Sequence, residues 1–332
     1  MLVSVIIPTY NRQESASRLL GCLCDQTMDS ENYEVIVIDD GSTSSTLGQN
    51  KSKFPYQFQY IWQDNQGATI ARNNGAINSR GQILVFIDDD VTVSPNTLQA
   101  LLDVCNREER VIALGSIVYR NENTESVYTR IVVSNDNIFS DLHQSNDQAI
   151  SYVECNTQIL AIQRKYFFEL RMFQDPTGGW PNWDDVDFGY RAHKAGFHFV
   201  RVGDAKGVHW DNSLSDLDST NLRWFQASKS AVQLFQKYPT LRLLIPMYID
   251  KTPVNWREDS AILIIKKVIR SIISSELMVD LMKIVINLLE KYLPEPKLLR
   301  PLYRWVSGAY MYQGYHQGLR EYRRVSEQVG IQ

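Results

Sequence analysis

The feature that most constrains the fold is an alternation of short apolar runs with helix patterns over the first 120 residues. Three of the runs are almost continuously apolar, which is typical of parallel strands that are buried on both faces. Strand–helix–strand repetition predicts right-handed crossovers, and hence an α/β fold with a doubly wound, mainly parallel sheet and flanking helices. The predicted strands are Leu2–Ile7, Glu34–Ile38, Gln57–Trp62, Ile83–Ile87 and Val111–Tyr119.

Helix signals fill the segments between these runs. Asn11 is predicted to cap a helix that ends at about Gln26, with Glu14 in the capping-box position. Beyond Leu214 the pattern becomes mostly helical. The further predicted helices are Ala68–Asn78, Pro95–Cys105, Asp184–Ala195, 219–237, 258–274, 276–292 and about 297–327.

Length and charge divide the chain in two. Its 332 residues allow about two domains at roughly 150 residues each. We expect a catalytic domain over 1–215, made of halves 1–120 and 121–215, and a helical C-terminal extension over 216–332. The formal charge of −4 disfavours a nucleic-acid binder, although residues 251–332 alone carry a net charge of +5. No secretory signal or membrane-spanning run is evident, so we expect a cytoplasmic protein.

Polar residues follow three of the predicted strands. In an open parallel sheet, ligands bind outside the carboxyl ends of the strands, so these residues mark a candidate site. Their five carboxylates would repel one another unless a cation or hydrogen-bond donors neutralised them. Carboxylate oxygens suit Mg²⁺ or Mn²⁺, and a divalent ion that bridges a diphosphate is the simplest interpretation. The segments are Pro8-Thr9-Tyr10-Asn11-Arg12, Asp39-Asp40-Gly41-Ser42 and Asp88-Asp89-Asp90.

Three further features carry candidate chemistry, each with a structural alternative. Arg72, near the start of a predicted helix, is suited either to a phosphate or to a structural ion pair. In the segment 178–191, two glycines and two tryptophans precede an acidic helix start, where Asp184 and Asp187 are suited to capping. Asp185, with aromatic neighbours, is suited to act as a general base. His209 is either a structural histidine or the nitrogen ligand of a metal site.

The motifs together resemble the family-2 glycosyltransferases, inverting enzymes of the GT-A fold that use nucleotide-diphosphate sugars. The resemblance covers roughly residues 2–215. In place of the usual glutamate this chain has Asp184, which weakens the case for acceptor contacts by that residue. The motifs that carry the resemblance are Val5-Ile6-Ile7-Pro8-Thr9-Tyr10-Asn11, Val37-Ile38-Asp39-Asp40-Gly41-Ser42, Gly67-Ala68 with Ala71-Arg72-Asn73, Asp88-Asp89-Asp90, Trp183-Asp184-Asp185-Val186-Asp187 and His209.

The resemblance implies an inverting, metal-dependent hexosyltransferase of glycan or glycolipid synthesis, with a nucleotide-diphosphate donor such as a UDP-sugar. Asp185 would be the catalytic base, and Asp90 with His209 would hold Mn²⁺ or Mg²⁺. Asp39 would read the nucleobase edge, Asp88 would bind ribose, and Arg72 would approach the base or the diphosphate. The donor-binding residues would be Pro8, Thr9, Tyr10, Arg12, Asp39, Arg72, Asp88 and Asp89. The acceptor-binding residues would be Gly179, Trp180, Trp183 and Asp184.

Two other functions and two uses of the C-terminal helices stay open. A sugar-nucleotidyltransferase is one rival, but its basic glycine-rich loop is missing; a non-catalytic nucleotide-sugar binding module is the other. A metal-dependent phosphatase is more distant. In the extension, Ile262, Ile265, Ile269 and Ile272 share one helical face. Such faces either pack within the protein or a homodimer, or contact the inner face of a membrane peripherally, near a lipid-linked acceptor.

Overall fold

The computed structural model describes residues 1–44, 47–48, 53–120, 126–133, 146–175, 183–210 and 216–329. They form two compact units. The first contains the described residues of 1–120, 136–175 and 184–211, and the second contains those of 121–135, 176–183 and 212–332. A short helix from the middle of the chain therefore groups with the C-terminal helices. The predicted domain boundary after residue 215 stays a prediction.

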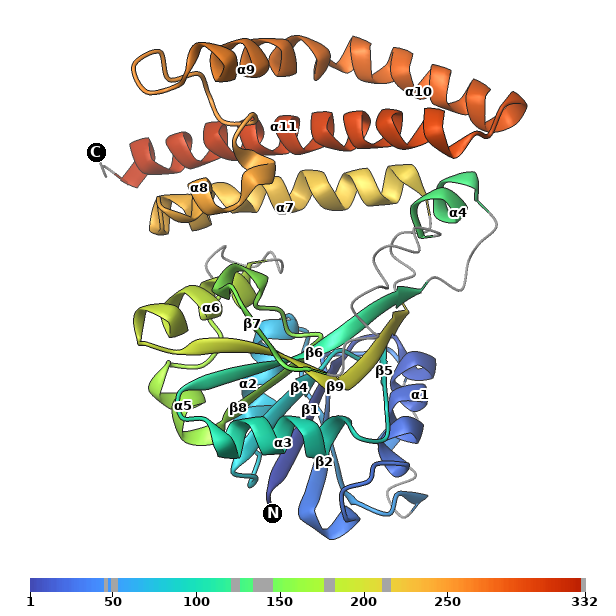
Figure 1. Cartoon of the computed structure of the whole chain (residues 1–332), viewed down its shortest axis with the longest axis vertical. Coiled ribbons are helices and arrows are strands. Elements are labelled where there is room, and N and C mark those ends of the chain that lie inside the picture. Colours follow the sequence, from blue (N-terminus) through green and yellow to red (C-terminus); the bar gives the residue numbers. More distant parts are fainter. Residues whose placement is uncertain are drawn as a thin grey trace. The chain divides into compact units, whose positions relative to one another are not determined.

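The first unit is built on a nine-stranded mixed sheet in its described part, with the strand order β3-β2-β1-β4-β8-β6-β9-β5 and with β7 beside β9 (Figure 1). Strands β3, β2, β1 and β4 are parallel to one another, as predicted. Strand β8 is antiparallel to both β4 and β6. The strands are β1 (Val3–Thr9), β2 (Tyr33–Asp39), β3 (Gln57–Trp62), β4 (Ile83–Ile87), β5 (Val91–Val93), β6 (Val111–Arg120), β7 (Gln148–Ile150), β8 (Ile159–Gln163) and β9 (His198–Trp210).

Helices cover both faces of this sheet, which explains the continuously apolar strands. On one face, Val5 and Ile7 pack with residues of α1 and α3. On the other face, Ile6 and Phe86 pack with residues of α2, α5 and α6. Alternate residues of β1 thus enter different cores, as the period of two along a strand requires. The helices are α1 (Gln13–Cys24), α2 (Ala68–Ile77), α3 (Thr97–Arg107), α5 (Arg164–Glu169) and α6 (Asp184–Lys194).

The point where strand order reverses lies at β1. The chain passes from β1 outward through β2 to β3, and then returns to place β4 on the other side of β1. Within this arrangement Thr9 and Asp39 are register partners at the ends of β1 and β2. The carboxyl ends of β1, β2 and β4 therefore meet at the edge where a ligand is expected.

The second unit is helical. Its buried core brings together residues of α4, α10 and α11, including Tyr128, Val279 and Val306. The long helix α11 runs beside α7 (Figure 1), and the contact is close because Gly314 and Gly318 face the backbone of α7. The helices are α4 (Val127–Val133), α7 (Leu217–Lys237), α8 (Leu241–Leu244), α9 (Ala261–Ile273), α10 (Glu276–Tyr292) and α11 (Pro296–Val329).

One predicted detail of α1 is wrong. Asn11 does not cap the helix: the cap position is Arg12, without a side-chain hydrogen bond to the helix. Asn11 has a φ of 53°, in the left-handed region that asparagine tolerates better than most residues. Its side-chain oxygen accepts a hydrogen bond from the backbone N–H of Thr43 at 3.0 Å, so it joins two loops instead.

Candidate active site

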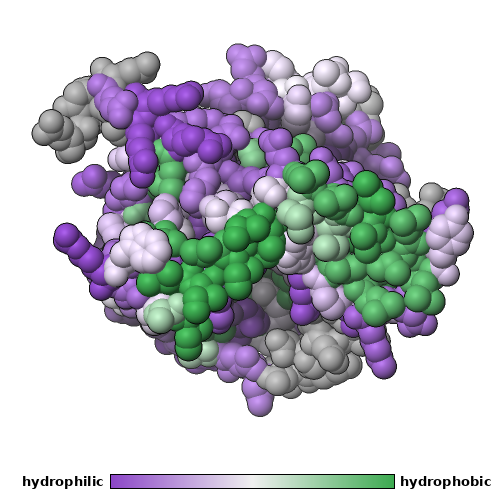
Figure 2. Space-filling model, turned by 90° about the horizontal axis from the view of Figure 1, so that it is seen from above, coloured by the Kyte–Doolittle hydropathy of each residue, from purple (hydrophilic) through white to green (hydrophobic). Residues whose placement is uncertain are grey.

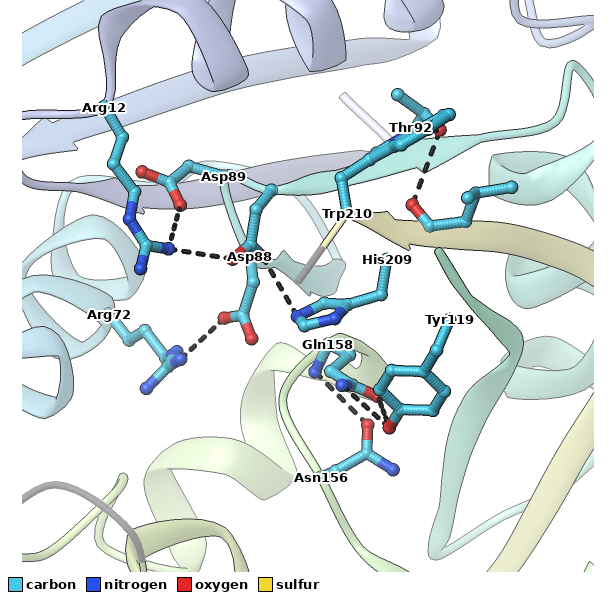
Figure 3. A network of polar contacts seen from close by, with 12 residues as sticks. Arg12, Arg72, Asp88, Asp89, Thr92, Tyr119, Asn156, Gln158, His209 and Trp210 are labelled. Carbon is cyan, nitrogen blue, oxygen red and sulfur yellow. Dashed lines mark hydrogen bonds and ion pairs between the residues drawn. The ribbon is translucent and has the colours of Figure 1, made fainter. Parts of the chain in front are cut away.

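The loop after β1 contacts the acidic segment after β4. The hydroxyl of Thr9 donates to Asp89 Oδ2 at 2.7 Å, and Arg12 Nη1 donates to Asp90 Oδ2 at 2.8 Å. Figure 3 shows Arg12 pointing toward Asp89, to which it also donates. Burial raises the pKa of Asp89 to about 6, although the Thr9 hydrogen bond and the Arg12 charge oppose the rise. The structure thus brings together the ends of β1 and β4, as the sequence predicted for a ligand site.

The two acidic residues after β2 have different surroundings. Asp39 is fully buried, where it accepts hydrogen bonds from the backbone N–H of Ser42 at 2.8 Å and from the Tyr60 hydroxyl at 2.5 Å. Asp40 accepts from the backbone N–H of Gly67 at 2.8 Å and so holds the loop that leads into α2. No local sequence pattern points to Tyr60, because its contact with Asp39 depends on the register of β2 and β3. The role of Asp39 in reading a nucleobase stays a prediction.

Arg72 joins β4 to the start of α6. Its Nη2 atom donates to Asp88 Oδ1 at 2.6 Å and its Nη1 atom to Asp184 Oδ2 at 3.3 Å. The Thr69 hydroxyl donates to the same Asp184 oxygen at 2.9 Å. Burial raises the pKa of Asp88, although the Arg72 charge opposes it. Arg72 and Asp184 are themselves buried, so this network fixes α2, β4 and α6 at one place.

The three acids in the first turn of α6 are not equivalent. Asp187 is fully buried and accepts from Arg191 Nε at 2.7 Å, which gives it a structural role. Asp184 is held by Thr69 and Arg72. Asp185 is partly exposed, and its side chain accepts from the backbone N–H of Val186 at 2.7 Å.

The surroundings of Asp185 disfavour its charged form. Burial is the largest cause and the neighbouring Asp184 charge is the next, and together they raise the pKa of Asp185 to about 8. The Val186 N–H and the Arg72 charge oppose this rise without cancelling it. A carboxylate that holds a proton until near neutral pH is a stronger base than an ordinary aspartate, which is the property a general base needs.

Asp90 and His209 form the candidate metal-binding pair. Nε2 of His209 lies 3.2 Å from Oδ1 of Asp90, and the imidazole packs edge-on against the Tyr119 ring. The two residues meet because β5 pairs with β9, which places Val91 opposite His209. Burial would raise the pKa of Asp90, but the hydrogen bond and charge of His209, with the charge of Arg12, outweigh it and lower the pKa.

This pair fits a divalent ion that shares its coordination with a substrate. In the described part of the chain, no three histidine, cysteine or acidic side chains surround one point. Mg²⁺ usually takes one or two carboxylates and completes its shell with phosphate oxygens and water. A carboxylate beside an imidazole, at the reversal point of the sheet, matches that requirement.

The remaining predicted residues differ in placement. Pro8 is buried in β1, whereas Tyr10 is exposed just after it. Trp183 is buried in the second unit, where its Nε1–H donates to the carbonyl of Ala227 at 2.8 Å and its ring contacts Tyr248. Gly179 and Trp180 lie outside the described residues. Acceptor contacts by these residues and by Asp184 stay predictions.

Residues 4–168 match the family model described as glycosyl transferase family 2, and the chain belongs to this family. The predicted family and its GT-A-type fold are thereby confirmed. The family is one of glycosyltransferases, which is the class of enzyme that the sequence predicted.

Curated relatives match in part. The validoxylamine A glucosyltransferase of Streptomyces hygroscopicus subsp. limoneus is 39% identical over 30% of this chain and 23% of its own length. The chondroitin synthase of Escherichia coli is 23% identical over 74% of this chain and 42% of its own. The uncharacterized glycosyltransferase YfnE of Bacillus subtilis is 26% identical over 64% of this chain and 65% of its own. The chain thus spans less than two thirds of each.

Two solved structures share the fold. S. aureus TarS 1-349 in complex with UDP aligns over 98% of this chain and 92% of its own, with a TM-score of 0.52 and 15% identity. GalNAc-T7 with UDP, GalNAc and Mn²⁺ aligns over 73% of this chain and 54% of its own, with a TM-score of 0.51 and 14% identity. At such low identity the likeness describes the arrangement of the backbone.

Proposed function

We propose that this chain is an inverting, metal-dependent glycosyltransferase that moves a sugar from a UDP-sugar to an acceptor hydroxyl of a glycan or glycolipid. The observation that carries the proposal is the convergence of three groups of residues at the reversal point of the sheet. These are the acids after β4, the arginines Arg12 and Arg72, and the partly exposed Asp185 with its raised pKa. The presence of UDP in both related structures supports the choice of nucleotide.

The donor would lie across the ends of β1, β2 and β4. Tyr10 and Asp39 would contact the base, Asp88 the ribose, and Arg72 the diphosphate. Arg72 is already fixed by Asp88 and Asp184, so little side-chain entropy is lost when a phosphate oxygen approaches its guanidinium. A divalent ion held by Asp90 and His209 would offset the negative charge of the leaving diphosphate.

Asp185 would act on the acceptor. Its carboxylate takes the proton of the acceptor hydroxyl while the hydroxyl oxygen forms a bond to the anomeric carbon. The bond from that carbon to the diphosphate oxygen breaks at the same time, and its electron pair leaves with the diphosphate. Attack from the face opposite the leaving group inverts the configuration at the anomeric carbon. Arg72 would stabilise the charge that develops on the leaving oxygens.

Release of UDP from a panel of UDP-sugars tests the proposal. The full chain with Mn²⁺ should hydrolyse at least one of them slowly in the absence of an acceptor, and a chelator should stop the release. A sugar-nucleotidyltransferase would instead release pyrophosphate from a nucleoside triphosphate and a sugar phosphate. A chain that binds UDP without turning over any donor, with any acceptor supplied, would favour the binding module.

A further inference from the structure

Helices α9 and α10 of the second unit carry exposed apolar side chains that do not take part in the buried core of that unit. Helix α10 buries Val279 and Ile286 against α4 and α11 on one side. Its opposite side exposes a second stripe, spaced by three and four residues as on one helical face. Helix α9 carries a matching stripe. We call the two stripes together the α9–α10 face; its residues are Ile262, Ile265, Ile269, Ile272, Leu277, Leu281, Ile284 and Leu288.

The face is extensive and strongly exposed. Ile262 and Leu277 are both 69% exposed. The space-filling view from above looks onto the side where Figure 1 draws α9 and α10, and it shows large apolar areas there (Figure 2). By the rise of an α-helix, 13 and 17 residues correspond to about 20 Å and about 25 Å of surface. An apolar patch of this extent marks a binding surface more often than chance exposure.

Aromatic residues lie at both ends of the α9–α10 face. Trp256, shortly before α9, is 75% exposed, and Tyr292, the last residue of α10, is 70% exposed. Tryptophan and tyrosine combine an apolar ring with a polar tip, and they concentrate where hydrocarbon meets lipid headgroups. In the described part of the chain, no helix has the length and apolar character to span a bilayer. A helix layer lying on a membrane is therefore the geometry that fits.

Charge along the α9–α10 face differs between its two helices. Helix α10 contains the exposed acids Glu276 and Asp280. Helix α9 contains three basic and no acidic residues. Lys267 is neutralised by Asp259 at 2.6 Å and Arg270 by Asp250 at 2.9 Å. For the exposed Lys266, no acidic partner lies within ion-pair distance among the described residues.

A cavity of about 540 Å³ opens beside α9, and its apolar walls include Ile249, Leu263, Ile269 and Ile273. Its polar lining consists of the paired Arg270 and Asp250 together with Lys266, so the cation available to an anionic headgroup there is Lys266.

We propose that the α9–α10 face binds an anionic membrane surface, with lipid headgroups at Lys266 and acyl chains against the isoleucines and leucines. This inference does not rest on the proposed function, because every residue that carries it lies in the helical unit. A transferase that acts on a lipid-linked acceptor would benefit from such an attachment, but a failure of either proposal leaves the other standing.

Co-sedimentation with vesicles tests the surface. The full chain should sediment with vesicles of equal parts phosphatidylglycerol and phosphatidylcholine at low salt, and less with phosphatidylcholine alone or at high salt. The double variant Ile265→Asp/Ile269→Asp should bind at least about tenfold more weakly, because two charged groups replace exposed apolar side chains that would contact the acyl chains. Leu222→Asp is the matched control: Leu222 in α7 is 58% exposed, as is Ile265, and its replacement should leave vesicle binding unchanged.

The contribution of charge to vesicle binding can be tested separately from that of the apolar side chains. Lys266→Glu should remove most of the preference for anionic vesicles while leaving weak binding to phosphatidylcholine. The proposal is overturned if the wild-type chain does not sediment with the mixed vesicles, or if the double variant sediments as well as the wild type. Light scattering supplies the alternative: a dimer that the double variant dissociates, without vesicle binding by the wild type, would assign the face to a second copy. Thermal melts of all variants establish that each is folded.

Discussion

Nε2 of His209 lies 3.2 Å from Oδ1 of Asp90, although the two residues are far apart in the chain. The pairing of β5 with β9 creates this contact. On the other side of the same carboxylate, Arg12 Nη1 lies 2.8 Å from Asp90 Oδ2. Asp90 is thus the acid on which the imidazole and the β1 loop converge, and it is the residue on which metal binding should depend most.

Metal dependence of nucleotide binding should follow this geometry. Asp90→Ala should abolish the gain in UDP affinity that Mn²⁺ provides, because it removes the charged ligand. His209→Ala should reduce that gain by less, since it removes one neutral ligand and no charge. Calorimetric titration of UDP with and without Mn²⁺ measures both effects. If the wild-type chain binds UDP equally well with and without Mn²⁺, Asp90 and His209 are not a metal-binding pair.

Removal of the proposed catalytic base should lower turnover without weakening donor binding. Asp185→Asn keeps the shape of the side chain but cannot accept a proton, so turnover should fall by about 10²–10⁴-fold. UDP affinity should stay within a few-fold, because Asp185 is assigned to the acceptor. Asp204→Asn, at an exposed position of β9, is a control that should leave both quantities unchanged. Near-normal turnover by Asp185→Asn would remove this residue from the mechanism.

The raised pKa of Asp185 predicts opposite trends for activity and stability. Below a pKa of about 8 the carboxyl group holds its proton, so kcat/KM should rise with pH and level off above that value. The folded state favours the protonated carboxyl more than the unfolded state does, so stability from this group is lost as pH rises toward 8. Relative to the wild type, Asp185→Asn should therefore gain thermal stability between pH 5 and pH 8. A pH-independent difference in Tm would show that Asp185 is not strained in its charged form.

The sequence predicts those features of the fold and the site that depend on neighbouring residues, and it fails for contacts between residues far apart in the chain. The strands β1, β2 and β4 follow from continuous apolar runs, and the acids that follow them are adjacent in sequence, so the position of the site is predictable. The partners of those acids are not. Tyr60 donates a hydrogen bond to Asp39 because of the register between their two strands. Trp183 packs against Tyr248 in an aromatic cluster. Asn11 has an ordinary capping sequence, yet its contact with a second loop overrides it.

The contact between α7 and α11 predicts the effect of a single methyl group. A Cβ atom added at Gly314 would lie 2.1 Å from the carbonyl oxygen of Phe225, and one added at Gly318 would lie 2.3 Å from that of Lys229. Both obstacles are backbone atoms of α7, which cannot rotate away. Gly314→Ala should therefore destabilise the helical unit by about 1–3 kcal/mol, the usual cost of overpacking, even though alanine favours helices.

Gly21 provides the matched control for this substitution. It also lies within a helix, α1, but a Cβ atom there would meet nothing within 4 Å. Gly21→Ala should stabilise the chain by up to about 1 kcal/mol, because only the helix preference of alanine remains. Denaturant unfolding of the two variants should thus shift the free energy of unfolding in opposite directions. Equal shifts would mean that α11 can move away from α7 at little cost, and that the two glycines do not set the distance between these helices.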